Sequence, residues 1–353
     1  MSDILFYLAA IVSLAFLIVV HEAGHYFVAR WCKMRIERFS IGFGPAVLKR
    51  TSKKTGTTFQ LAPIPFGGFV EIRGMNIAEE IDPEDRQAYP NRPVWQRFVT
   101  IFAGPATNYL SAMVLAFVLY TCHGVDVPHW YGVESVLPDY DAYGKLEHAD
   151  RIVAVDHVPV FIDTGPSLIA RVGASNGAPI TLSIERKGQP REVTIKPRQD
   201  KDAGGKPVWR IGVQPVAQTL VADVGVIGAT ELALRYPVDK TKAIGAGLYG
   251  IVFGEEKADP GGPIRMVEEF HHAFSEGIVH GITLVMMLSV YLGMFNLLPI
   301  PALDGGRLVF LIYEMVTRRR ANPKIETMVH MAGIMTLGVV MILVLIIDIK
   351  HLF

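Results

Sequence analysis

Charge and cysteine are both scarce in this sequence. Of its 353 residues only 19% are charged, whereas 50% are hydrophobic, and the mean hydropathy is positive. Soluble domains of ordinary composition carry about 25% charged residues. The formal net charge is zero and no long acidic or basic run is present, so the composition gives no indication of a nucleic-acid partner. These deficits favour a membrane protein.

The cysteine count and the N-terminus exclude two further classes of protein. Cys32 and Cys122 are too few for a disulfide framework or a four-cysteine zinc site, and the topology predicted below separates them, so we expect no bond between them. The N-terminal apolar run follows MSD, without the positive region of a signal peptide, and HEAGH follows the run in place of a small-residue cleavage site. We interpret the run as a retained membrane helix.

Four apolar segments are long enough, or nearly so, to cross a bilayer as helices, which takes about 20 residues each. They comprise residues 4–20 running on into HEAGH, 98–122, 278–298 and 328–347. The second segment has no charged residue, and the fourth has only the titratable His330. Any one of them could instead be a buried core helix, but four in one chain predict a polytopic α-helical membrane protein.

Lysine and arginine collect on one side of the predicted helices. They are Arg30, Lys33, Arg35, Arg38, Lys49, Arg50, Lys53, Lys54, Arg92 and Arg97 between the first two helices, and Arg318, Arg319 and Arg320 between the last two. Acidic residues follow the second helix instead. Because cytoplasmic loops are enriched in Lys and Arg, we predict cytoplasmic loops at 31–97 and 299–327. Both termini and the segment 123–277 then lie outside the cytoplasm.

The chain divides into four predicted parts. Residues 1–122 hold the first two helices, and 278–353 hold the last two. Residues 123–217 form an inserted β-rich domain, because IVAVDHVPV, PITLSIERK and REVTIKP alternate apolar and polar residues, with a short helix at SLIARVGAS. Residues 218–277 are apolar stretches interrupted by Pro237, and they indicate either an amphipathic connector on the membrane surface or ordinary connecting helices.

The cytoplasmic loop contains a second predicted β region. TTFQLAPIPFGGFVEIRG, at 57–74, is typical of a strand pair joined through PIPFGG, and its apolar character predicts a β-hairpin associated with the membrane. Open strand edges are tolerated at membrane depth only where protein or water satisfies them. An extended substrate could therefore pair with this edge.

The motif HEAGH carries the predicted chemistry. On a helix, His21 and His25 are four residues apart and share one face, so that they can bind one zinc ion. Zinc lowers the pKa of a bound water toward about 7, and Glu22 can take a proton from that water. Polar residues at the end of an uncharged span are costly unless they are functional, which favours a metal site over a histidine packed in a core.

A catalytic zinc site needs a third protein ligand. The best candidate is Asp304 in NLLPIPALDGGR, where Pro299 and Pro301 should interrupt the third helix and two glycines permit unusual backbone angles. The alternative is that Asp304 caps a helix. We favour the ligand role because the predicted topology places Asp304 and HEAGH at the same membrane depth.

The predicted position of this site indicates its substrate. A peptide bond inside a transmembrane helix is already hydrogen-bonded and shielded from water, so hydrolysis requires local unwinding and groups that hold the exposed backbone. Asn296 can donate and accept hydrogen bonds for that purpose; its alternative role is a helix-terminal cap.

These motifs together resemble a known family, the site-2 proteases, which are intramembrane zinc metalloproteases, and in particular the bacterial branch with a PDZ domain between the second and third helices. The matching sequences are HEAGH at 21–25, GFGP at 42–45, PFGGFVEIRG at 65–74, GPATN at 104–108, GGP at 261–263 and NLLPIPALDGG at 296–306. We interpret GPATN as a site of close helix packing.

The resemblance implies a complete set of site residues. His21, His25 and Asp304 would bind Zn²⁺, Glu22 would act as general acid and base, and Asn296 would help to hold the substrate strand. The PFGG segment, which includes Gly67 and Gly68, would form the membrane-associated β-hairpin beside that strand. The active site would lie near the cytoplasmic side of the inner membrane.

The resemblance also implies the partners. Members of this family cut single-pass membrane proteins, typically anti-sigma factors already shortened by an upstream site-1 protease, and sometimes signal-peptide remnants. Their PDZ domain excludes uncut substrates by size. This chain departs from the usual PDZ pattern, with Ala149 and His157 where glycine is common, so we expect a steric filter rather than a peptide-binding groove.

Three alternative functions use the same residues. An inactive relative would keep the fold as a membrane scaffold or binding protein. A metal transporter would use the intramembrane histidines and aspartate as an ion pathway, but it would need a second ion-binding layer and no β-rich domain. An anchored metalloprotease acting in water would carry HExxH in its soluble part, and this chain does not.

Overall fold

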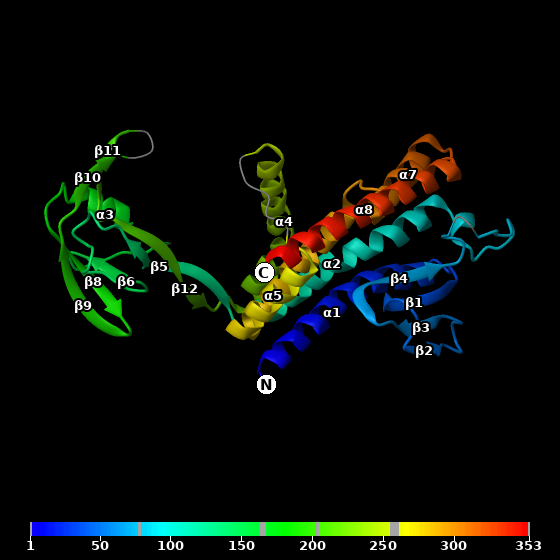
Figure 1. Cartoon of the computed structure of the whole chain (residues 1–353), viewed down its shortest axis with the longest axis horizontal. Helices are drawn as coiled ribbons and strands as arrows, with labels where there is room; N and C mark the ends of the chain where they lie inside the picture. The colour runs from blue at the N-terminus through cyan, green and yellow to red at the C-terminus, as the bar shows by residue number, and fades with distance from the viewer. Residues whose placement is uncertain (1, 77–78, 163–166, 202–204, 255–260, 352–353) are drawn as a thin grey trace. The chain divides into compact units, whose positions relative to one another are not determined.

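The computed structural model describes residues 2–76, 79–162, 167–201, 205–254 and 261–351. The chain forms two compact units (Figure 1). One unit combines Met1–Tyr120 with Val226–Phe353, and the other is Thr121–Gly225.

The four predicted membrane helices are present in the structure and are long and apolar enough to cross a membrane. They are α1 (Ser2–Trp31), α2 (Val94–Cys122), α6 (Ile278–Leu297) and α8 (Pro323–His351). Each extends or matches the apolar segment predicted from the sequence. At the end of α1 and the start of α2, the exposed rings of Trp31 and Trp95 lie 6.4 Å apart. Both cysteines are free.

The described part of this unit also contains the α-helices α4 (Gly225–Val252), α5 (Pro263–Glu276) and α7 (Asp304–Thr317). Contrary to prediction, Pro237 does not interrupt α4. The adjacent Tyr236 is buried in a cluster with side chains of α2 and α6, and this packing outweighs the hydrogen bond that proline removes. α7 was not predicted, because two prolines closely precede it and its own first turn contains Gly305 and Gly306.

Helix α5 packs between α1 and α6. Phe270 is fully buried beside Ala10 and Leu17 of α1 and Val285 of α6. The Asp348 carboxylate, near the end of α8, accepts hydrogen bonds at 2.8 and 3.1 Å from the backbone N–H groups of Gly262 and Ile264. These otherwise unpaired donors at the start of α5 are thereby satisfied.

The cytoplasmic loop of the prediction folds as a four-stranded sheet and not as a hairpin. Its strands are β1 (Ile36–Phe43), β2 (Leu48–Thr51), β3 (Thr58–Leu61) and β4 (Ile64–Ile72), in the order β2-β3-β1-β4. β3 and β4, which were expected to pair through PIPFGG, lie on opposite sides of β1. The link between them crosses β1 at Gly42, which has φ +87° and where a Cβ would lie 2.6 Å from the Ala62 carbonyl oxygen. β4 is therefore an outer strand of the sheet.

The second unit is the predicted β-rich domain. It comprises β5 (Val125–Val136), β6 (Arg151–Val155), β7 (Val158–Pro159), α3 (Leu168–Ala174), β8 (Ile180–Arg186), β9 (Gln189–Ile195), β10 (Arg198–Lys201), β11 (Pro207–Arg210) and β12 (Val213–Ala222). The main sheet runs β12-β5-β6-β8-β9, with β7 paired to β6. The strands and short helix predicted from IVAVDHVPV, PITLSIERK, REVTIKP and SLIARVGAS are confirmed.

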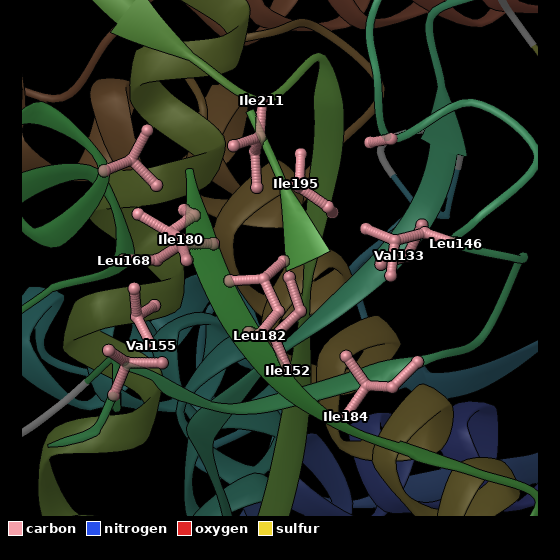
Figure 2. Packing of buried hydrophobic residues seen from close by; sticks show 13 residues of the cluster. Val133, Leu146, Ile152, Val155, Leu168, Ile180, Leu182, Ile184, Ile195 and Ile211 are labelled. Atoms are coloured by element: carbon pink, nitrogen blue, oxygen red, sulfur yellow. The ribbon is translucent and has the colours of Figure 1, made fainter. Parts of the chain in front are cut away.

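This domain has its own apolar core, in which Ile152, Leu182 and Ile195 are fully buried (Figure 2). Ala149 and His157, where the sequence departs from the glycine pattern, have φ of +68° and +62°. Both positions thus adopt the left-handed conformation that glycine reaches without steric cost. The fold accommodates both side chains, and Asp150 beside Ala149 is buried and paired with Arg186 at 2.7 Å.

Candidate metal centre

Helix α1 supplies two nitrogen atoms to the candidate centre. His21 and His25 are both buried, and their Nε2 atoms lie 3.3 Å apart. The four-residue spacing places both imidazoles on the same face of the helix, with their ring centroids 4.9 Å apart.

Asp304 reaches this face because the chain breaks sharply after α6. The helix ends at Leu297, before Pro299 and Pro301, and α7 begins at Asp304. The turn is tight, since a Cβ on Gly305 would lie 2.0 Å from the Leu298 carbonyl oxygen. The alternative interpretation of Asp304 as a helix cap is wrong, because the residue at the cap position is Leu303.

The carboxylate of Asp304 instead faces the two histidines. Its Oδ2 atom lies 3.1 Å from His21 Nε2 and 3.3 Å from His25 Nε2. Burial acts to raise the pKa of Asp304, but the two adjacent imidazoles outweigh it, so the pKa lies below its ordinary value. The carboxylate is therefore held in its charged form.

These three side chains fit a zinc ion. Among the described residues they are the single group of His, Cys, Asp and Glu side chains able to hold a metal. Asp304 Oδ2 is buried and receives no hydrogen bond from any described residue. Tetrahedral zinc with bonds of about 2.0–2.1 Å has its ligand atoms about 3.3 Å apart, which matches the three separations. Two nitrogens and one oxygen also leave a fourth position open.

Helix α2 contacts the other nitrogen of each ring. His25 Nδ1 lies 2.8 Å from the Thr100 carbonyl oxygen, to which it donates when Nε2 binds a metal. His21 Nδ1 lies 3.0 Å from Asn108 Nδ2, and Asn108 Oδ1 is buried without a partner among the described residues. Turning the amide presents Oδ1 to the Nδ1–H group of His21. Both rings are thereby oriented.

Neither of these contacts was predicted. GPATN was interpreted as close helix packing, and the structure confirms that role at Gly104, where a Cβ would lie 2.3 Å from His25 Nε2. Gly24 of α1 is equally tight, at 2.3 Å from the Ala103 carbonyl oxygen. The available signal for Asn108 was its amide within an uncharged membrane span, where a polar side chain is functional by default. Thr100 acts through its backbone and leaves no signal in the sequence.

A cavity of about 280 Å³ surrounds the three candidate ligands. Glu22, the predicted proton acceptor, and Asn296, the predicted substrate-holding residue, both line it. Gly67 and Gly68 do not line it. A Cβ on Gly68 would lie 3.4 Å from Glu22 Cγ, whereas one on Gly67 would collide with the ring of Phe43. The two glycines thus let β4 lie against α1 and the sheet.

A larger cavity of about 710 Å³ adjoins the first. Both cavities are lined by Phe69, Val70 and Ile72 of β4, and by Arg307 of α7. The larger one extends to the beginnings of α2 and α8. The outer strand β4 therefore borders both cavities, the smaller of which contains the candidate ligands.

Comparison with known proteins relates this geometry to an enzyme family. Residues 9–340 match the sequence model described as peptidase family M50. A protein of Rickettsia conorii is 31% identical over 359 residues, covering 97% of this chain and 98% of its own. A protein of Mesorhizobium japonicum is 33% identical, covering 91% and 92%, and one of Fusobacterium nucleatum is 30% identical, covering 98% and 99%. All three bear the name "Putative zinc metalloprotease".

Proposed function

Because the chain belongs to peptidase family M50, the site-2 protease family of zinc metalloproteases, we propose that it hydrolyses a peptide bond within or near the transmembrane helix of single-pass membrane proteins. The observation that carries this proposal is the convergence of His21, His25 and Asp304 beside Glu22, on a helix long and apolar enough to span a membrane. A soluble substrate would not require the site to be on such a helix.

We assign the roles as follows. His21, His25 and Asp304 hold the zinc ion. When bound there, zinc would supply Lewis-acid chemistry, polarising a carbonyl group and lowering the pKa of a water molecule. Glu22, which lines the same cavity, takes a proton from that water and delivers it to the leaving amine. Asn296, across the cavity, hydrogen-bonds the backbone of the unwound substrate.

The outer strand β4 is the proposed docking edge for the substrate. An extended peptide paired with β4 satisfies the backbone groups that unwinding exposes. Phe69, Val70 and Ile72 line both cavities, so a strand along β4 runs past the metal ligands and into the larger hollow. Gly67 and Gly68 contribute by keeping β4 close to α1, rather than by contacting the substrate directly.

The distribution of positive charge supports a topology with the active site near the cytoplasmic side of the inner membrane. The termini and the β-rich domain are then extracytoplasmic. We propose that the domain is PDZ-like and admits only substrates already shortened, for example by an upstream site-1 protease. An anti-sigma factor or a signal-peptide remnant would be such a substrate.

The test is the variant Glu22→Gln in the full chain, with Glu84→Gln at an exposed position as the control. Zinc content and cleavage of a reporter single-pass helix are measured in membranes. Because only the proton acceptor is lost, we expect zinc to remain and cleavage to fall by about 10²–10⁴-fold. Cleavage at the control rate by Glu22→Gln would contradict the assignment.

The same assay separates the remaining alternatives. A scaffold would bind zinc in the wild-type form without cleaving any reporter helix. A transporter would require a second ion-binding layer, and the described part of the chain contains one candidate metal group only. Mass spectrometry of membranes containing Glu22→Gln identifies the client as a trapped, shortened fragment.

A further inference from the structure

Helix α8 contacts the segment that carries Asp304 through two residues one turn apart. The backbone N–H of Ala302 donates a hydrogen bond to His330 Nδ1 at 3.3 Å. At Gly333 the helix lies so close to the segment that a Cβ would be 2.4 Å from Pro301 Cβ. His330 and Gly333 are three residues apart, so both lie on the face of α8 that meets residues 299–303.

The residue held in this way has a strained backbone. Ala302 has φ +79°, a left-handed conformation that alanine rarely adopts. Such residues persist only where the surrounding structure fixes them, and they cluster at functional sites. Ala302 lies two residues before Asp304, so its conformation sets the direction in which the chain enters α7.

The imidazole of His330 has a defined orientation. Its ring lies 5.9 Å from the ring of Phe310 on α7. Since Nδ1 accepts a hydrogen bond, the proton of the neutral ring is on Nε2, which is buried without a partner among the described residues. His330 also lines the larger cavity beside the metal centre. It is the one titratable residue of the fourth apolar segment, and none of the roles assigned above includes it.

The rest of α8 offers little other support for this contact. It is the least buried of the four candidate spans, with side chains such as Met335 68% exposed. Near its other end, Asp348 and Val344 of α8 contact Gly262 at the start of α5, and many other apolar side chains of α8 are exposed. The contact with residues 299–303 is therefore a specific attachment rather than part of a broad packed interface.

We propose that His330 is a positioning residue for the metal centre: by accepting the Ala302 N–H it fixes the strained turn and aims the Asp304 carboxylate at the two histidines. Gly333 contributes by admitting Pro301 against α8. This inference rests on the proposed role of Asp304 as a zinc ligand. It assigns to α8 a direct part in metal binding, although α8 supplies no ligand.

The experiment measures the zinc affinity of the purified full chain by competition with a chelator. His330→Phe keeps an aromatic ring beside Phe310 but removes the acceptor, whereas His330→Asn places an amide oxygen close to the position of Nδ1. Met335→Ala, on the outward face of α8, is the control. We expect His330→Phe to weaken zinc binding about five- to tenfold, somewhat less than the 10–100-fold typical of a direct partner of a ligand. His330→Asn and the control should stay within about twofold of wild type.

The kinetic constants provide a second readout. A misdirected Asp304 impairs the chemical step, so His330→Phe should lower kcat with little change in KM. If His330→Phe does not fold, as judged by thermal unfolding in detergent, Gly333→Ala replaces it. That variant leaves His330 in place but displaces Pro301, and we expect the same loss of zinc affinity.

Two results would overturn the inference. One is wild-type zinc affinity in whichever of His330→Phe and Gly333→Ala is folded. The other is an equal loss in His330→Asn and His330→Phe, which would assign His330 a packing role. Asp304→Ala is measured alongside as a reference. If that variant binds zinc normally, the proposed function fails, whereas failure of the His330 series alone leaves the proposed function intact.

Discussion

At the residue scale, the centre depends as much on the groups behind the histidines as on the ligands themselves. Asn108 is fully buried in α2 and meets His21 Nδ1, while the Thr100 carbonyl oxygen meets His25 Nδ1. Such partners fix the tautomer and the direction of each imidazole and raise its basicity. A polar side chain at this depth is also costly unless it is hydrogen-bonded.

Asn108→Leu tests this role with a side chain of similar size and no amide. We expect zinc affinity to fall about 10–100-fold, because His21 Nδ1 loses its partner. The measurement is chelator competition on the purified protein, with Leu110→Ala, 57% exposed on the same helix, as the control. Zinc affinity equal to that of the control would show that Asn108 serves helix packing alone.

The sequence predicted some of these residues and not others, for a physical reason. The pairing of His21 and His25 could be predicted from HEAGH alone, since residues four apart lie on the same face of a helix. The ligand role of Asp304 was predicted from the prolines and glycines around it and from the need for a third zinc ligand. Asn108 and His330 act across 87 and 28 residues of chain, and no local pattern records such contacts.

At the scale of elements, α1 and α2 cross with no free space between them on the side of the histidines that faces α2. Gly24 and Gly104 allow the two backbones to approach, and the space that a Cβ on Gly104 would take is filled by the His25 imidazole. Small residues permit this approach in membrane helices. The packing of α1 against α2 thus determines the position of the His25 imidazole.

Gly104→Ala should therefore damage the centre. The added methyl group would lie 2.3 Å from His25 Nε2 and 2.9 Å from His21 Cε1, so one ring must move. We expect zinc affinity to fall at least about tenfold, measured by chelator competition. Gly338→Ala in α8, where no atom lies within 4 Å, is the matched control, and identical affinities in both variants would contradict the argument.

The four-stranded sheet of β1 to β4 shows where prediction of elements from sequence stops. The residues of β3 and β4 were predicted as strands, whereas β1 and β2 were not predicted, and the expected hairpin of β3 and β4 was wrong because β1 lies between them. Alternating apolar residues specify which face of a strand is buried. They do not specify the neighbouring strand, which here depends on the crossing at Gly42. The correction leaves β4 at the outer edge, beside both cavities.

At the scale of the whole molecule, the two units were predicted from different kinds of sequence pattern. The membrane helices were predicted from length and hydropathy, which the bilayer imposes directly. The β-rich domain was predicted from alternation and turns, and its core is complete within itself. Val125 at the start of β5 pairs with Ala222 at the end of β12, so the domain begins and ends on neighbouring strands.

Replacing residues 125–222 by a short flexible linker should consequently leave the membrane unit folded. We expect cleavage of a pre-shortened reporter to continue within about threefold of wild type, and a reporter with an intact outer domain to become cleavable as well. Both reporters are followed in membranes, and Glu22→Gln in the same background is the control. Loss of all cleavage with normal membrane insertion would argue against a filtering role.

The positions of Trp31 and Trp95 indicate how far the metal centre lies from the membrane surface. Tryptophan side chains collect where hydrocarbon meets headgroups, and both of these rings are exposed at the ends of their helices. With a rise of about 1.5 Å per residue, His25 and His21 lie about 9 and 15 Å along α1 from this marker. In the proposed topology, water therefore has to travel only two or three helical turns from the aqueous boundary to reach the candidate ligands.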